Sequence, residues 1–218
     1  LFGHNLWVSH LLILPFSIGL LYQLHLFVSY YVKNTTLAFF AFILIAVDPT
    51  LSAQFVLVNP EIISLFFFFL AINAILYDKY YLKIVALFFL SIVSYRSMML
   101  AAGVFLFEFL NYALIHKQKI KSILNAKFIL SYVLGSIPAV LFVIWRLMTK
   151  GWLQSHPDSP WAELWQVASP QIFLRNILVL GHRYADFGRI FIILFIIYSV
   201  FKFKKIIFTK EIKQLLLL

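Results

Sequence analysis

Three short polar segments of the chain carry the residue types that acid–base chemistry and anion binding require. The first covers residues 48–61 and holds two carboxylates, and the second is the arginine-containing turn 94–97. The third, residues 181–189, holds one histidine, two arginines and one aspartate. A carboxylate beside a reacting hydroxyl acts as a general base, and arginine binds phosphate in a bidentate manner. These segments therefore predict a site for an anionic substrate.

The segment 181–189 supplies four candidate side chains. We assign Arg183 and Arg189, together with His182, to an anionic phosphate group, and Asp186 to a catalytic role. The alternative is a structural ion pair, either Arg183–Asp186 or Asp186–Arg189, because exposed pairs of this kind often contribute only to structure. The two interpretations are left open at this point.

The segment 48–61 contains two helix starts. Residues 48–49 and 59–60 each consist of an N-cap acceptor followed by proline, which is typical of the first turn of a helix. We expect a short interfacial helix at 49–58 and place Glu61 in the first turn of the next helix. Asp48 and Glu61 are catalytic candidates; the alternative is that both only cap helices and interact with the helix dipole.

The composition of the chain is that of a membrane protein. Of its 218 residues, 63% are hydrophobic and 12% are charged, whereas a soluble domain is about half apolar and a quarter charged. The net charge of +10 does not indicate nucleic-acid binding, because no basic stripe with interleaved aromatics lies on a polar domain. Cysteine is absent, and no histidine pair has the spacing or carboxylate company of a zinc site, so we predict no metal ligands.

The apolar runs predict an all-α fold, a polytopic transmembrane helical bundle of about seven spans with short interfacial helices in its outer loops. We expect a single transmembrane domain over residues 1–218, with a long extracytoplasmic loop at 149–189. Because the chain starts at Leu1 and stops within an apolar run, we expect it to be an internal part of a longer membrane protein. The predicted spans are Leu6–Val32, Thr36–Val47, Pro60–Tyr77, Tyr81–Tyr95, Ser97–Ile115, Phe128–Met148 and Ile190–Phe201.

The basic residues divide between the two predicted sides of the membrane. Twelve lysines fall on one side, which the positive-inside rule makes cytoplasmic: residues 33, 79, 83, 117, 119, 121, 127, 202, 204, 205, 210 and 213. The five arginines, at positions 96, 146, 175, 183 and 189, fall on the other. Arg96 is a candidate ligand of an anionic substrate; the alternative is an arginine that snorkels to the interface. Glu108 lies within a span, nearer the lysine side, and we expect it to form an interhelical hydrogen bond or lie at the interface.

With these segments in place, the chain resembles the GT-C class of membrane glycosyltransferases, specifically the protein-mannosyltransferase-like family (glycosyltransferase family 39-like) of bacterial membranes. The resemblance covers most of the chain and rests on short motifs in a fixed order: Leu1-Phe-Gly-His, Asp48-Pro-Thr-Leu-Ser-Ala-Gln-Phe, Asn59-Pro-Glu61, Tyr95-Arg96-Ser-Met-Met and Asp186-Phe-Gly-Arg189.

The resemblance implies a lipid-linked donor, a polyprenyl-phosphate sugar. It places an essential acidic residue in an outer loop just before Leu1 and a second acidic residue at Glu61, where the family often has a Pro-Asp pair. It assigns Arg96 to the donor phosphate, and Arg183 and Arg189 to the same purpose. No organic cofactor is implied, and a divalent metal requirement is left open.

We therefore expect a glycosyltransferase of the hexosyl, mannosyl or aminoarabinose type in the bacterial inner membrane. It would transfer sugar to a lipid, glycan or protein acceptor at the extracytoplasmic face. We expect it to interact with the lipid bilayer and not with nucleic acid. Two alternatives are a lipid or glycolipid transporter (flippase), in which polar residues usually lie near the midplane, and a non-catalytic membrane subunit.

Overall fold

The structure is a computed structural model that describes residues 6–56, 59–151, 170–185, 189–202, 210–215 and 217–218. These residues form helices and turns and contain no strand, so the predicted all-α class is confirmed for this part of the chain. The helices are α1 (Leu6–Tyr31), α2 (Thr35–Ala46), α3 (Pro49–Val56), α4 (Pro60–Leu76), α5 (Tyr80–Val93), α6 (Tyr95–Leu110), the π-helical turn η1 (Asn111–Ile115), α7 (Ile120–Ile123), α8 (Ala126–Lys150), α9 (Pro170–Ala185), α10 (Arg189–Lys202) and α11 (Lys210–Leu215).

Three of these helical segments are long and apolar enough to cross a membrane: His10–Tyr31, Tyr95–Ile115 and Ala126–Lys150. The pair α2 and α3 is bent by 66° and would add a fourth if it forms one broken span. At 1.5 Å per residue, α4 and α5 reach roughly 26 and 21 Å, less than the ~30 Å of a hydrocarbon core. The described part of the chain is therefore all-helical, and its three long apolar helices indicate an integral membrane protein. The expected number of about seven spans is not confirmed.

The chain separates into two compact units. The first comprises Leu1–Leu141 together with Gln214–Leu218, and the second comprises Phe142–Lys213. Helix α8 therefore begins in the first unit and ends in the second. Within the second unit, α9 contacts α10.

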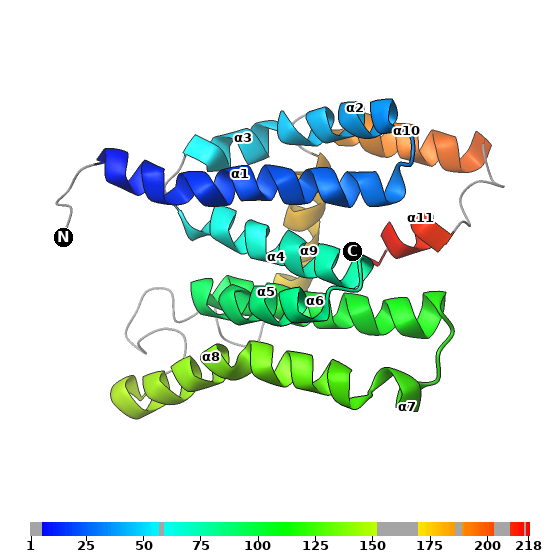
Figure 1. Ribbon diagram of the computed structural model, residues 1–218. Helices are drawn as coiled ribbons and strands as arrows, with labels where there is room; N and C mark the ends of the chain where they lie inside the picture. Colours follow the sequence, from blue (N-terminus) through cyan, green and yellow to red (C-terminus); the bar gives the residue numbers. More distant parts are fainter. Residues whose placement is uncertain (1–5, 57–58, 152–169, 186–188, 203–209, 216) are drawn as a thin grey trace. The chain divides into compact units, whose positions relative to one another are not determined.

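Helix α4 is the centre of the first unit, and most of its residues from Leu70 onward are buried. It lies between α1 and α5 (Figure 1). Helices α1 and α4 run in parallel, because the Asn73 amide donates to the Gln23 carbonyl at 2.8 Å and the Tyr77 hydroxyl donates to the Leu26 carbonyl at 2.9 Å. Helix α5 turns back, and α6 returns in the direction of α4.

This alternation separates the polar residues into two ends. The first residues of α4 and α6 lie at one end, which carries Glu61 and Arg96. The first turns of α5 and α8 and the last turn of α6 lie at the other end, as the contacts of Glu108 show. The second end also carries the lysine-rich segment 116–127. The predicted separation of the lysines from Arg96 thus holds within this unit.

Two glycines allow helices to approach closely. A Cβ atom at Gly19 of α1 would lie 2.6 Å from the ring of Phe66 on α4, and one at Gly135 of α8 would lie 2.5 Å from the Cβ of Leu87 on α5. Distances below 3.0 Å do not occur for real Cβ atoms. These α1–α4 and α5–α8 contacts therefore depend on the absence of a side chain.

One predicted helix end was wrong. In the sequence, Ser169-Pro170 predicts a helix start, and the glycine after the mainly apolar run 172–180 predicts a helix end at Gly181. Instead, α9 continues through Gly181 to Ala185. A terminating glycine adopts the left-handed backbone conformation, and among the positive-φ residues of the described chain the only glycine is Gly151. By contrast, α4 is followed by a residue in the left-handed conformation, Asp78, with φ 54°.

Candidate functional site

The structure brings together two of the candidate residues, Glu61 and Arg96. The guanidinium Nη1 of Arg96 lies 3.1 Å from Oε1 of Glu61, although the two residues are 35 positions apart in sequence. The Arg96 side chain is 86% exposed and that of Glu61 is 43% exposed. The pair is therefore accessible to a ligand rather than enclosed in the core.

Local capping fixes where each of these residues lies. The Asn59 side chain accepts a hydrogen bond from the Glu61 backbone N–H at 3.1 Å and begins α4, with Pro60 in the first turn. At the start of α6, Ser94 and Ser97 form a reciprocal capping box, which satisfies two otherwise unpaired donors. Glu61 and Arg96 are thus both held in the first turn of a well-started helix.

This placement favours the binding of an anion beside the pair. The first turns of α4 and α6 lie at the positive ends of their helix dipoles, which favour negative charge. Arg96 adds a planar cation that can form two parallel hydrogen bonds to a phosphate. The Glu61 carboxylate adds a hydrogen-bond acceptor 3.1 Å from that cation. The arrangement can hold an anionic group and accept a proton or hydrogen bond next to it.

Asp48 caps a helix, which was the alternative to a catalytic role for this residue. Its Oδ1 accepts hydrogen bonds from the backbone N–H groups of Thr50 at 2.9 Å and Leu51 at 3.2 Å. These bonds start α3, Pro49–Val56, which agrees with the predicted short helix after Asp48-Pro49. The structure therefore accounts for Asp48 as a helix cap, and its catalytic assignment stays a prediction.

The candidates of segment 181–189 belong to the second unit. His182 is an exposed residue of α9, Arg183 lies in the same helix, and Arg189 begins α10. Asp186 lies outside the described residues. The same holds for a further proline-started helix, which Asp158-Ser159-Pro160 predicts. The assignments of His182, Arg183, Asp186 and Arg189 stay predictions.

A second polar cluster joins α5, α6 and α8 inside the first unit. The Lys83 ammonium lies 2.8 Å from Oε1 and 3.0 Å from Oε2 of Glu108, and the Tyr132 hydroxyl donates to Oε2 at 2.5 Å. The side chains of Lys83 and Glu108 are only 6% and 5% exposed. The interhelical hydrogen bonding expected of Glu108 is confirmed.

The burial of Lys83 was not predicted. We placed it with the lysines of the cytoplasmic side, and it lies at the lysine end of the unit, but it is buried in the first turn of α5 and faces Glu108. The physical reason is that a carboxylate within apolar helices needs a counterion. The sequence did contain a signal, since Lys83 precedes the apolar residues Ala86 and Leu87 at helical spacing.

A polar cavity of about 290 Å³ surrounds this pair at the lysine end of the unit, lined by Tyr80, Lys83, Glu108, Tyr112, Gln118, Ile123, Asn125, Lys127 and Phe128. A smaller cavity of about 90 Å³ adjoins it and adds Asp78 to several of the same residues. Next to it, the buried Gln214 amide donates to Asn111 at 2.8 Å. Sequence reasoning missed this cavity because its residues come from the start of α5 and from the stretch 108–128, whose folding back on α5 is not visible in the sequence.

Among the described residues, no three histidine, aspartate or glutamate side chains gather closely enough to hold a metal ion. The candidate site is therefore described by its charges and hydrogen bonds alone. We compared the chain with protein-family models, curated proteins and solved structures, and none of the three comparisons found a match.

Proposed function

We propose that the protein is a membrane glycosyltransferase that transfers a sugar from a polyprenyl-phosphate donor to an acceptor at the extracytoplasmic face of a bacterial inner membrane. The observation that carries this proposal is the exposed Glu61–Arg96 pair, whose members lie in the first turns of α4 and α6. It is supported by the resemblance of both motifs to the protein-mannosyltransferase-like family.

The chemistry of sugar transfer needs both members of the pair. The acceptor hydroxyl forms a bond to the anomeric carbon while the bond from that carbon to the donor phosphate oxygen breaks. Negative charge then develops on the departing polyprenyl phosphate, and a positioned guanidinium stabilises it. Arg96 is assigned to this phosphate, and Glu61 positions the acceptor hydroxyl or assists in removing its proton.

The existing ion pair suggests how substrate binding changes the site. In the absence of substrate, Arg96 is held by Glu61 at 3.1 Å. A donor phosphate with two negative oxygens competes for the same guanidinium, because bidentate contacts to phosphate are strong. Transfer of Arg96 to the phosphate releases the Glu61 carboxylate for the acceptor. Donor binding thus prepares the acceptor side of the site.

The test uses the full-length protein in proteoliposomes with radiolabelled polyprenyl-phosphate sugars and an acceptor extract, and it measures label transferred to the acceptor. Arg96→Ala should lower turnover about 10²–10³-fold, as does the loss of other groups that stabilise developing negative charge, and Arg96→Lys should restore only part of it. Arg175→Ala, which changes an exposed arginine of α9, is the matched control. Undiminished transfer by Arg96→Ala would contradict the assignment.

A lipid or glycolipid transporter is the second candidate, and the buried polar groups of the first unit favour it. Lys83 and Glu108 lie among the helices, and Asn73 of α4 donates to the Gln23 side chain of α1 at 2.8 Å. Transporters place such groups along the substrate path. Proteoliposomes that move a fluorescent lipid between leaflets, but release no sugar from any lipid-linked donor, would favour this candidate over the enzyme.

A further inference from the structure

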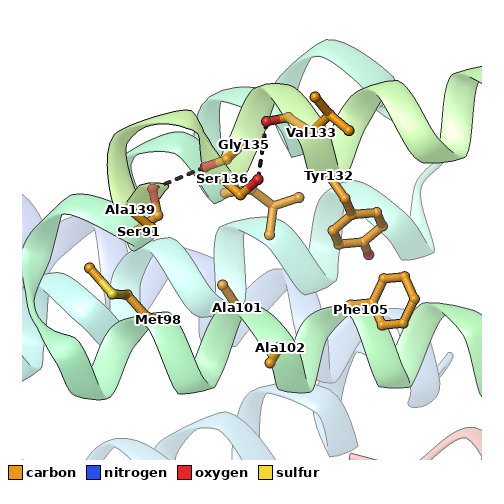
Figure 2. A pocket seen from close by; sticks show the side chains of 11 residues that line it. Ser91, Met98, Ala101, Ala102, Phe105, Tyr132, Val133, Gly135, Ser136 and Ala139 are labelled. Atoms are coloured by element: carbon orange, nitrogen blue, oxygen red, sulfur yellow. Dashed lines mark hydrogen bonds between the residues drawn. The ribbon is translucent and has the colours of Figure 1, made fainter. Parts of the chain in front are cut away.

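An apolar cavity of about 380 Å³ lies between α5, α6 and α8. It lies on the side of the buried Lys83–Glu108 pair that is nearer to the start of α6. Its wall includes Met98, Ala101, Ala102 and Phe105 on α6, and Gly135 with its neighbours on α8. Figure 2 shows the residues that line the cavity, with Tyr132 beside Phe105 at one end. Ser91 reaches across and donates to the Gly135 carbonyl at 3.0 Å. The cavity is thus an apolar space between helices that are tied together.

The apolar cavity and the polar cavity follow one another along the same three helices. Along α6 and η1, the lining passes from Met98 and Phe105 in the apolar cavity to Glu108 and Tyr112 in the polar one. The rings of Phe105, Phe128 and Tyr132 lie between them, with centroids 5.0–5.6 Å apart. Phe105 is 40% exposed, so the ring cluster is not enclosed, and a ligand that occupies both cavities must pass along its exposed side.

We propose that this path, which we term the α5–α6–α8 track, holds one anionic phospholipid of the lysine-side leaflet. Its phosphate headgroup lies in the polar cavity, and one acyl chain follows the apolar cavity. The headgroup end of the track lies at the opposite end of the unit from the Glu61–Arg96 pair, and the proposal does not depend on the proposed enzyme activity.

The dimensions of the track fit one lipid. The 14 residues from Met98 to Tyr112 correspond to roughly 21 Å of helix, whereas one leaflet of the hydrocarbon core is about 15 Å thick. The track is therefore long enough for an acyl chain of one leaflet with its headgroup beyond it. Cavities of about 290 and 380 Å³ lie near the lower part of the range of small-molecule sites, ~300–1,000 Å³.

The charges of the polar cavity favour an anionic headgroup. Lys83 and Glu108 neutralise each other, so Lys127 leaves the lining with one positive charge. The lining residue Gln118 lies between Lys117 and Lys119 in the sequence. Asp78, in the smaller adjoining cavity, opposes this charge. The cytoplasmic leaflet is rich in anionic lipids, and basic pockets between helices on that side bind their headgroups.

The first experiment titrates the full-length protein in detergent with dioleoyl phosphatidylglycerol and counts bound lipid by native mass spectrometry. We expect one saturable site for phosphatidylglycerol and at least fivefold weaker binding of dioleoyl phosphatidylcholine. Lys127→Gln should weaken phosphatidylglycerol binding about fivefold, the factor that corresponds to ~1 kcal/mol for one lysine near the headgroup. Lys150→Gln, at the other end of α8, is the matched control and should change nothing.

The second experiment fills the apolar cavity. Ala102→Phe should abolish saturable binding, because Ala102 lines the cavity. Gly103→Phe is the matched control, since a Cβ at Gly103 meets nothing within 4 Å, and it should bind lipid as the wild type does. Thermal unfolding followed by circular dichroism checks that both variants fold.

Three results would overturn the proposal. The first is equal affinity for phosphatidylglycerol and phosphatidylcholine, and the second is unchanged binding in Lys127→Gln. The third is full displacement of the lipid by glycerol 3-phosphate at equal concentration, which would show that the polar cavity binds a free phosphate and that the acyl chain contributes nothing.

Discussion

The buried Lys83–Glu108 pair gives the sharpest test of the fold. Replacement of Lys83 by methionine leaves the Glu108 carboxylate among apolar helices with only the Tyr132 hydroxyl as a bonded side chain. Removal of one partner from a buried ion pair costs about 3–5 kcal/mol, because the remaining charge loses its compensation. Both side chains are 6% exposed or less, so we expect Lys83→Met to fall within this range.

The two single variants should differ in their cost. In Glu108→Leu, the remaining Lys83 is the fourth residue of α5, and its flexible side chain can reach the aqueous end of the helix. We therefore expect Glu108→Leu to cost less than Lys83→Met, roughly half as much on the same scale. The double variant Lys83→Met/Glu108→Leu should lie within about 1 kcal/mol of the wild type, since apolar pairs of similar volume replace buried ion pairs without loss.

The assay is reversible unfolding of the purified protein in mixed micelles, with helicity as the signal and a double-mutant cycle as the analysis. A coupling free energy above about 2 kcal/mol would agree with a buried pair. Lys79→Met, which changes an exposed lysine of the same helix start, is the control and should cost less than about 0.5 kcal/mol. Costs of the single variants that simply add in the double variant would refute the reasoning.

Three further substitutions test helix packing and helix ends by the same unfolding assay. Gly135→Ala should destabilise the protein by about 1–3 kcal/mol, because its Cβ would lie 2.5 Å from that of Leu87. Gly103→Ala, with open space around its Cβ, should instead stabilise the protein by about 0.5–1 kcal/mol. Equal effects at the two sites would contradict the packing of α8 against α5. Asp78→Gly should stabilise the protein by a few tenths to about 1 kcal/mol, because Asp78 has φ 54°. A loss of stability would mean that the interactions of the Asp78 carboxylate stabilise the protein more than the backbone conformation destabilises it. Asn59→Ala should lower the free energy of unfolding by about 1 kcal/mol through loss of the α4 cap. Asn59→Asp keeps a side-chain acceptor and should retain most of the stabilisation that the cap provides.

The sequence predicted those features that depend on neighbouring residues. The helix starts at Asp48-Pro49 and Asn59-Pro60 were predicted correctly because an N-cap and its N–H donors lie within three positions. Gly181 was misread as a helix end, since a glycine alone does not show which backbone conformation its surroundings select. Local chemistry thus predicted helix starts better than helix ends.

The contacts between helices needed tertiary information. The shared side of Glu61 and Arg96 followed from the alternation of spans, but their 3.1 Å contact joins positions 35 residues apart. The partner of Glu108 could not be identified, because a lysine near a helix end can face either water or a neighbouring helix. Only the packing of α5 against α6 shows that Lys83 faces Glu108.

The tight turn at Ser94 has a consequence for how the protein enters the membrane. Helices α5 and α6 are separated by this one residue and form a helical hairpin, within which Lys83 and Glu108 meet. Inserted separately, each helix would carry an uncompensated charge, whose cost is ~2.5–3.5 kcal/mol at the bilayer centre and smaller near the helix ends where these two residues lie. Inserted together, the hairpin presents the translocation machinery with a neutral pair. The order of biogenesis is thereby coupled to the sequence: α5 gains its counterion only when α6 has left the ribosome.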